Sequence, residues 1–178
     1  MAISWDLLEG RPVSPGALVV QSVEYMRHIT GHEGWRAEAQ GYVLGRPWSW
    51  EQDRAWAPGP AVEFDVEVAV HLGIRTGRAH VISEQELEDH GSPVEGHASI
   101  EVRVDRTQTS AAVGLATALS AYALSGGDLS GEGLSRWHRP GEFDEVLDIF
   151  RPSDAESPAL DAAVQRLGTM LGVAGLAL

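Results

Sequence analysis

Large apolar residues alternate with polar residues or alanine from residue 62 to residue 72, and apolar with polar residues from residue 98 to residue 105. Successive side chains of a β-strand point to opposite faces of a sheet, so each pattern predicts a strand with one buried face and one polar face. The same period, less regular, predicts a strand from 35 to 44 and a short one from 78 to 83.

Other segments place apolar residues three and four positions apart, which is the spacing of one face of a helix. Ser14 followed by Pro15 is a start signal, because the serine side chain caps the first turn and proline has no N–H to satisfy there. Gly31 is a stop signal for the same helix. The predicted helices run from 15 to 30, from Thr107 or Thr109 to Gly126, from Pro140 to Phe150, and from Ser157 to Leu171.

The order of the predicted elements is one helix, four strands and three helices. Short consecutive strands usually pair as a meander, and strands with one polar face belong in an antiparallel sheet that is covered on one side only. We therefore predict a single α+β domain over residues 1–178, with an antiparallel sheet of about four strands and helices packed mainly on one face. We also expect the 62–72 and 98–105 strands to be neighbours in that sheet.

Carboxylates dominate the polar face of the two clearest strands. If helices cover the apolar face, the opposite face is wet and negative, and like charges on neighbouring strands destabilise a sheet modestly. Arg103 and His71, or a basic partner, would offset this repulsion. The acids expected on this face are Glu63, Asp65, Glu67, Glu101 and Asp105.

Three tryptophans fall between Gly45 and Pro60, where glycines and prolines predict a segment without regular structure. Large aromatic side chains are costly to leave exposed, so they either pack inward or meet a partner. Trp48, Trp50 and Trp56 therefore form a binding hot spot or close one open end of the sheet as core. The sequence leaves both alternatives open.

The chain has 26 acidic and 13 basic residues and a formal charge of -13. Such a field repels phosphate backbones and anionic lipids, so we expect neither a nucleic acid nor a membrane surface as partner. It suits a basic protein partner. No signal segment or run of eighteen apolar residues occurs, so we expect a cytoplasmic protein.

Missing residue types exclude several chemistries. Cysteine is absent, which removes disulfides, thiolate metal ligands and a cysteine nucleophile. Lysine is also absent, which removes Schiff-base catalysis and the lysine of a phosphate-binding loop. The segment from Gly126 to Gly133 lacks the spacing of a nucleotide-binding loop, and we expect it to be a turn between helices.

Histidines offer the alternative of metal chemistry. His28 and His32 are four residues apart, but Gly31 is expected to end the helix between them. Histidines 71, 80, 90 and 97 lie in or beside the predicted strands, where they could converge on a metal with the carboxylates of the open face. That arrangement predicts a small metal-dependent hydrolase or lyase. Because the spacing matches no ligand motif, we assign no metal ligand, cofactor or catalytic residue.

Residues 111–150 contain Ala-Leu-Ser-Gly-Gly-Asp and then Gly-Leu-Ser-Arg-Trp-His-Arg-Pro-Gly-Glu-Phe-Asp-Glu-Val-Leu. This stretch resembles the C-terminal part of small bacterial immunity and immunity-like proteins, in which an alanine-rich helix ends at a double glycine before the next helix. The resemblance implies a cytoplasmic protein that neutralises a toxin by occluding it, and it brings no catalytic residue with it.

These observations together favour a non-enzymatic acidic protein that binds a basic protein partner, as an immunity-type inhibitor or an assembly subunit. The apolar C-terminal run from Met170 to Leu178 either completes the core or docks onto a second copy of the chain. The residues predicted to contact the partner are Trp48, Trp50, Trp56, Glu63, Asp65, Glu67 and Glu101.

Overall fold

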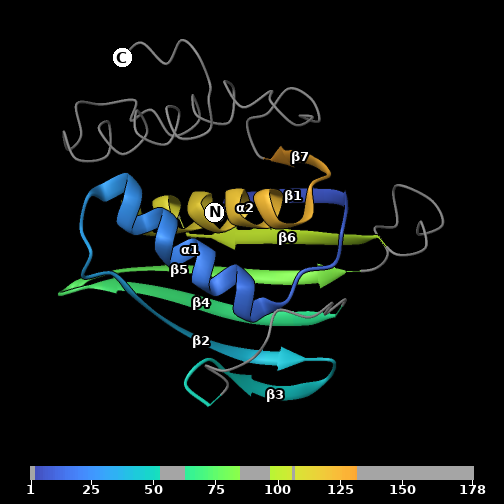
Figure 1. Ribbon diagram of the computed structural model, residues 1–178, viewed down its shortest axis with the longest axis horizontal. Helices are drawn as coiled ribbons and strands as arrows, with labels where there is room; N and C mark the ends of the chain where they lie inside the picture. Colours follow the sequence, from blue (N-terminus) through green and yellow to red (C-terminus); the bar gives the residue numbers. More distant parts are fainter. Residues whose placement is uncertain (1–2, 53–62, 85–96, 106, 132–178) are drawn as a thin grey trace, which may run out of the picture.

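The computed structural model describes residues 3–52, 63–84, 97–105 and 107–131, which form a seven-stranded antiparallel sheet and two helices (Figure 1). The α+β class and the antiparallel sheet are confirmed, but seven strands replace the expected four. The elements are β1 (Ile3–Gly10), α1 (Pro15–Thr30), β2 (Arg36–Val43), β3 (Arg46–Ser49), β4 (Phe64–Leu72), β5 (Arg75–Glu84), β6 (Ala98–Val104), α2 (Gln108–Ser125) and β7 (Asp128–Gly131).

The strand order is β3-β2-β4-β5-β6-β1-β7. Strands β2, β4, β5 and β6 form the expected meander, whereas β1 enters from the N-terminal side and pairs with β6. The expectation that the 62–72 and 98–105 strands are neighbours is wrong, because β5 lies between β4 and β6. A tight turn at Gly73 and Ile74 returns the chain directly onto β4, so that Leu72 faces Arg75 and Phe64 faces Ser83.

Helix α1 begins and ends where its sequence signals place it. The Ser14 side chain accepts a hydrogen bond from the backbone N–H of Ala17 at 3.2 Å, and Gly31, with φ of 70°, donates its N–H to the Arg27 carbonyl. The prediction of a helix from Thr107 to Gly126 is also confirmed: Thr107 is the N-cap of α2 and Gly126 follows its last residue.

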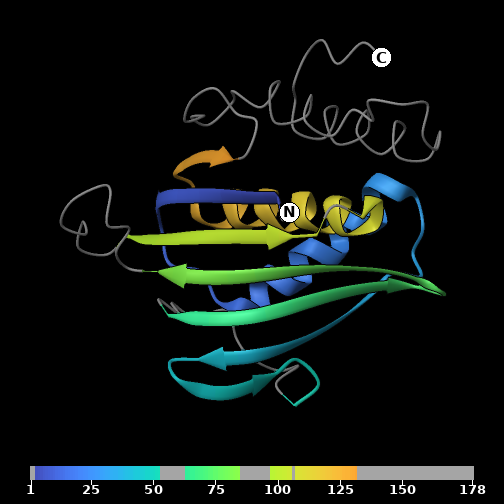
Figure 2. The same ribbon diagram turned by 180° about the vertical axis from the view of Figure 1, so that it is seen from behind.

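Both helices lie on one face of the sheet, and no described helix covers the other face (Figures 1 and 2). The covered face is the alternating apolar one, with Val66, Val68 and Trp5 almost fully buried beneath the helices. Helix α2 lies very close to the sheet at Gly77, where a Cβ atom would be 2.5 Å from the Thr109 carbonyl oxygen. Gly114 of α2 lies equally close to the sheet, because a Cβ atom there would be 2.4 Å from Val104 Cγ1.

Two expectations about irregular segments are wrong. Part of the tryptophan-rich segment is strand β3, because a tight turn at Leu44 and Gly45, both with positive φ, folds it back onto β2. The expected turn after Gly126 includes strand β7 at the far edge of the sheet. Leu129 of β7 faces Leu7 across the ladder and is buried, which gives the short strand its anchor.

Several predictions lie outside the described residues: the helices expected at 140–150 and 157–171, the C-terminal apolar run, Trp56 and His90. Within the described ranges, neither helix is long and apolar enough to cross a membrane.

Candidate binding face

Figure 2 views the sheet from the side opposite the helices, here called the open face. The registers of the ladders place polar side chains in rows across the strands of this face. Residues that face one another in an antiparallel ladder project from the same side, so the register defines each row. One row is Gln40, Glu67, His80, Arg103 and Ser4. The next is Tyr42, Asp65, Ile82, Glu101 and Asp6.

Basic side chains from β5 and β6 lie among the carboxylates of the open face. His80 of β5 pairs with Asp65 of β4. Arg103 of β6 donates to both carboxylate oxygens of Glu101, at 2.6 and 2.7 Å, a bidentate pair that leaves the Glu101 side chain 17% exposed. The acids of β4 and β6 therefore do not form one continuous negative surface.

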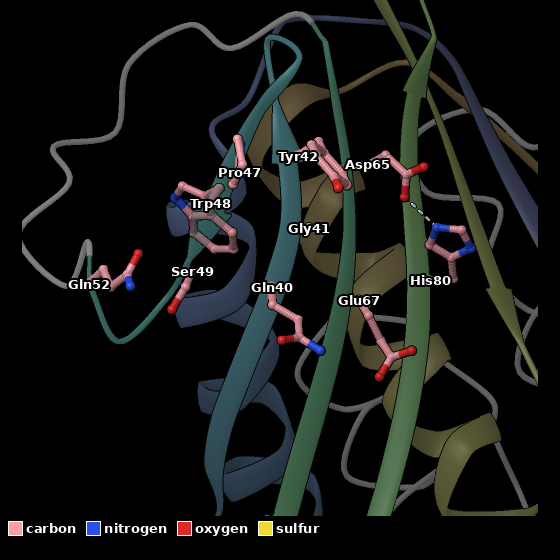
Figure 3. A pocket seen from close by; sticks show the side chains of 10 residues that line it. All are labelled: Gln40, Gly41, Tyr42, Pro47, Trp48, Ser49, Gln52, Asp65, Glu67 and His80. Carbon is pink, nitrogen blue, oxygen red and sulfur yellow. Dashed lines mark hydrogen bonds and ion pairs between the residues drawn. The ribbon is translucent and has the colours of Figure 1, made fainter.

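A trough lies on the open face over β2, β3, β4 and β5 (Figure 3). It consists of two depressions, about 640 and 230 Å³ in volume, that share Gln40, Ser49 and Glu67. The larger one lies within the size range of small-molecule sites. The side chains that line the trough include Glu38, Gln40, Tyr42, Trp48, Ser49, Glu51, Gln52, Asp65, Glu67, His71, Arg78 and His80.

The lining of the trough is acidic. Its four carboxylates are those of Glu38, Glu51, Asp65 and Glu67, and its one guanidinium is that of Arg78. With both histidines counted as neutral, the formal charge of the lining is -3. Arg78 reaches Glu67 only at 3.7 Å, and both side chains are well exposed. An exposed pair of this kind contributes little to stability, so Glu67 is available to a partner at small cost.

The predicted tryptophan cluster is mainly core. Trp48 is 8% exposed and belongs to the continuous apolar core, with only one side toward the trough, and Trp50 is half-buried against the same core. The exposed aromatic side chain of the trough is Tyr42, at 58%. The sequence analysis did not single out Tyr42. Its place among the polar positions of the 35–44 strand did indicate an aromatic side chain on the exposed face.

Three of the expected acids lie away from the trough. Glu101 is on β6, where it pairs with Arg103, and it does not line the trough. Glu63 precedes β4, where its side chain is exposed and its backbone carbonyl accepts a hydrogen bond from the Leu44 N–H at 2.8 Å. The Asp105 side chain does not belong to the open face but is hydrogen-bonded to Thr107, the N-cap of α2. It accepts hydrogen bonds from the Thr107 hydroxyl at 2.7 Å and the Thr107 N–H at 3.0 Å, and these bonds lower the pKa of Asp105.

Asp6 is a half-buried acid that faces Glu101 across the β1–β6 ladder. Burial, and then the Glu101 charge, raise the pKa of Asp6, while Arg103 partly offsets them. Because the folded-state pKa is raised, folding favours the protonated acid, and the stability present below the unfolded-state pKa is lost as the pH rises through the folded-state pKa.

We expect Asp6→Asn to raise the free energy of unfolding at neutral pH by roughly 0.2–1 kcal/mol, the size of a typical cross-strand side-chain interaction. The difference from the original chain should shrink as the pH falls and Asp6 becomes protonated. Urea unfolding at neutral and acidic pH measures this difference in the free energy of unfolding. Ser4→Ala, on the same strand and face, is the control. A gain that is independent of pH would contradict the charge explanation.

The histidines of the described residues do not converge. His71 Nδ1 lies 2.9 Å from the Thr76 hydroxyl, His97 Nδ1 lies 2.9 Å from the Glu9 carbonyl, and His80 pairs with Asp65. His28 and His32 are exposed on either side of Gly31, which ends the helix between them as predicted. Over the described ranges, no group of three or more metal-binding side chains is present.

No protein family, curated protein or solved structure matches this chain.

Proposed function

We propose that this chain is a non-enzymatic binding protein that holds a basic segment of a protein partner in the trough of the open face. The single observation that carries the proposal is the combination of exposed carboxylates with the exposed ring of Tyr42 in one open trough. Complementary charge speeds encounter and selects the partner, while an aromatic ring contributes contact area at low entropic cost.

The scaffold supports this role because the lining side chains project mostly from strands. Asp65 and Glu67 stand on β4, a central strand with neighbours on both sides, and Tyr42 stands on β2. Functional side chains placed on strands are held more accurately than side chains on loops. Among the residues first predicted to contact the partner, Asp65 and Glu67 are retained in the proposal, and Tyr42 replaces the tryptophans as the exposed aromatic.

A narrower form of the proposal is an immunity-type inhibitor that occludes a toxin, or a subunit of a larger assembly. It rests on the resemblance of residues 111–150, of which residues 111–131 are described as the body of α2 and the strand β7. An acidic protein that covers a basic toxin would use charge in the way the trough allows.

The test is a charge-neutral variant of the trough, Glu38→Gln with Asp65→Asn and Glu67→Gln. Protein captured from the source organism at low salt identifies the partner, and calorimetry with the purified partner then measures the dissociation constant. We expect a one-to-one complex that weakens as salt rises, and at least about tenfold weaker binding by the variant, which corresponds to about 1.4 kcal/mol.

The matched control is Glu24→Gln with Glu33→Gln and Glu84→Gln, which changes the net charge equally at exposed positions outside the trough. We expect the control to bind within about twofold of the original chain, since these surface charges lie away from the proposed contact. Equal losses in both variants, or a complex that salt does not weaken, would contradict the proposal.

A further inference from the structure

Three of the four carboxylates of the trough follow the repeat of the sheet. Three consecutive rows join β2 to β4: Tyr42 faces Asp65, Gln40 faces Glu67, and Glu38 faces Ala69. Each row contributes one carboxylate to the trough, and the three acid side chains are 56%, 46% and 69% exposed in the order Asp65, Glu67, Glu38. Ser49 and Gln52, at the end of β3 and just after it, line the side of the trough (Figure 3).

Successive rows are about 6.8 Å apart, because same-face residues of a strand are two positions apart at roughly 3.4 Å each. An extended peptide has the same repeat between its alternate side chains. A peptide that lies along β2 and β4 would therefore bring every second side chain to successive rows, and thus to successive carboxylates. A segment with adjacent basic residues would point half of them away from the trough.

We propose that the trough binds an extended segment of the partner with arginine at every second position. This inference rests on the proposed function and names the chemistry of the bound segment. The alternate side chains of the segment face solvent, and its guanidinium groups pair with Asp65, Glu67 and Glu38 in successive rows.

Arginine fits the lining better than lysine at the Tyr42 row. A guanidinium is planar, so it can stack on the exposed Tyr42 ring while it donates two parallel hydrogen bonds to the Asp65 carboxylate in the same row. In the next row Gln40 faces Glu67, and its side-chain amide oxygen supplies a further acceptor in the trough. The compact ammonium of lysine offers neither the plane nor the paired donors.

The first experiment compares three synthetic probes by calorimetry and by shifts of the backbone amide resonances at low salt. The probes are acetyl-Arg-Ser-Arg-Ser-Arg-amide, acetyl-Arg-Arg-Arg-Ser-Ser-amide with the same charge and composition, and the alternating peptide with neutral citrulline for arginine. We expect the alternating peptide to bind at least about fivefold more tightly than the clustered one. The citrulline peptide should not bind, and the shifts should centre on Gln40, Tyr42, Asp65 and Glu67.

Two pairs of variants test the assignment of side chains. Glu67→Gln should weaken the alternating peptide several-fold, whereas Glu84→Gln, on the same face but outside the trough, should leave it unchanged. A fourth peptide, with lysine in place of each arginine of the alternating peptide, measures the preference for arginine. Tyr42→Leu should reduce this preference, whereas the control Val20→Leu, at an exposed apolar position on α1, should not.

Equal affinity for the alternating and clustered peptides, or for spermine and the alternating peptide, would overturn the inference, because either result means charge attraction without register. Shifts centred elsewhere would overturn it too. Failure of this inference is distinguishable from failure of the proposed function. If the triple trough variant loses the partner but the alternating peptide fails to bind, the partner uses the trough in another way and only the register is wrong.

Discussion

Replacing Trp5 with alanine is expected to lower the free energy of unfolding by about 3–5 kcal/mol, because it leaves a large cavity in the core. Trp5 is 1% exposed and stands on the helix-covered face of β1, between β6 and β7. Its ring lies directly against α2: a Cβ atom at Gly114 would be 2.7 Å from Trp5 Cζ3. The substitution therefore removes contacts with both layers of the fold.

Urea unfolding followed by circular dichroism measures this loss as a lower midpoint at an unchanged slope. Trp5→Phe is the matched control, because it keeps an aromatic ring in the same place, and we expect it to cost much less than Trp5→Ala. Since the whole stability of a domain is about 5–15 kcal/mol, the alanine variant should be partly unfolded at physiological temperature. A cost below about 1 kcal/mol would mean that β1 contributes little to the core.

Replacing Gly41 with alanine is expected to cost at least about 2 kcal/mol and to distort the trough. Gly41 has a φ of 155°, and a Cβ atom there would be 2.0 Å from the Asp65 carbonyl oxygen and 2.7 Å from the Val66 Cα. Both contacts are with backbone, which cannot rotate away as a side chain can. The strands β2 and β4 must therefore separate locally at Gly41 and Val66, next to the row that holds Tyr42 and Asp65.

The control for Gly41→Ala is Gly45→Ala. Gly45 also has a positive φ, 71°, but a Cβ atom there would have open space around it. We expect Gly45→Ala to cost only the conformational penalty of about 1–2 kcal/mol and to leave the amide resonances of the trough in place. Equal costs for the two variants, with the trough resonances unchanged in both, would show that the close approach of β4 does not constrain Gly41.

Local signals in the sequence were sufficient for most of the described elements. Alternation over nine or more residues identified β4, and helical spacing between a serine cap and a glycine stop identified α1. Each of these signals depends on neighbours along the chain, so it does not require knowledge of the tertiary fold. The same alternation correctly placed the Asp65 and Glu67 side chains on the solvent side of the sheet.

Short or interrupted strands gave no such signal. Strands β3 and β7 have four residues each, too few to show a period, and β3 contains Pro47. In β1 the alternation breaks at Leu8, next to an irregularity in its ladder with β6. Strands β1 and β7 form because strands distant in the sequence supply their hydrogen bonds, whereas β3 pairs with the preceding strand β2 and depends on the tight turn between them.

The sequence by itself determined that this protein has an antiparallel sheet with one apolar and one charged face, because side-chain alternation is a property of each strand alone. Only the tertiary structure decided which charges meet. The insertion of β5 between β4 and β6 places His80 beside Asp65 and separates Asp65 from Glu101. The return of β3 onto β2 adds the side of the trough. Strand order depends on where each turn directs the chain and on what each face buries, and no single segment of the sequence contains that information.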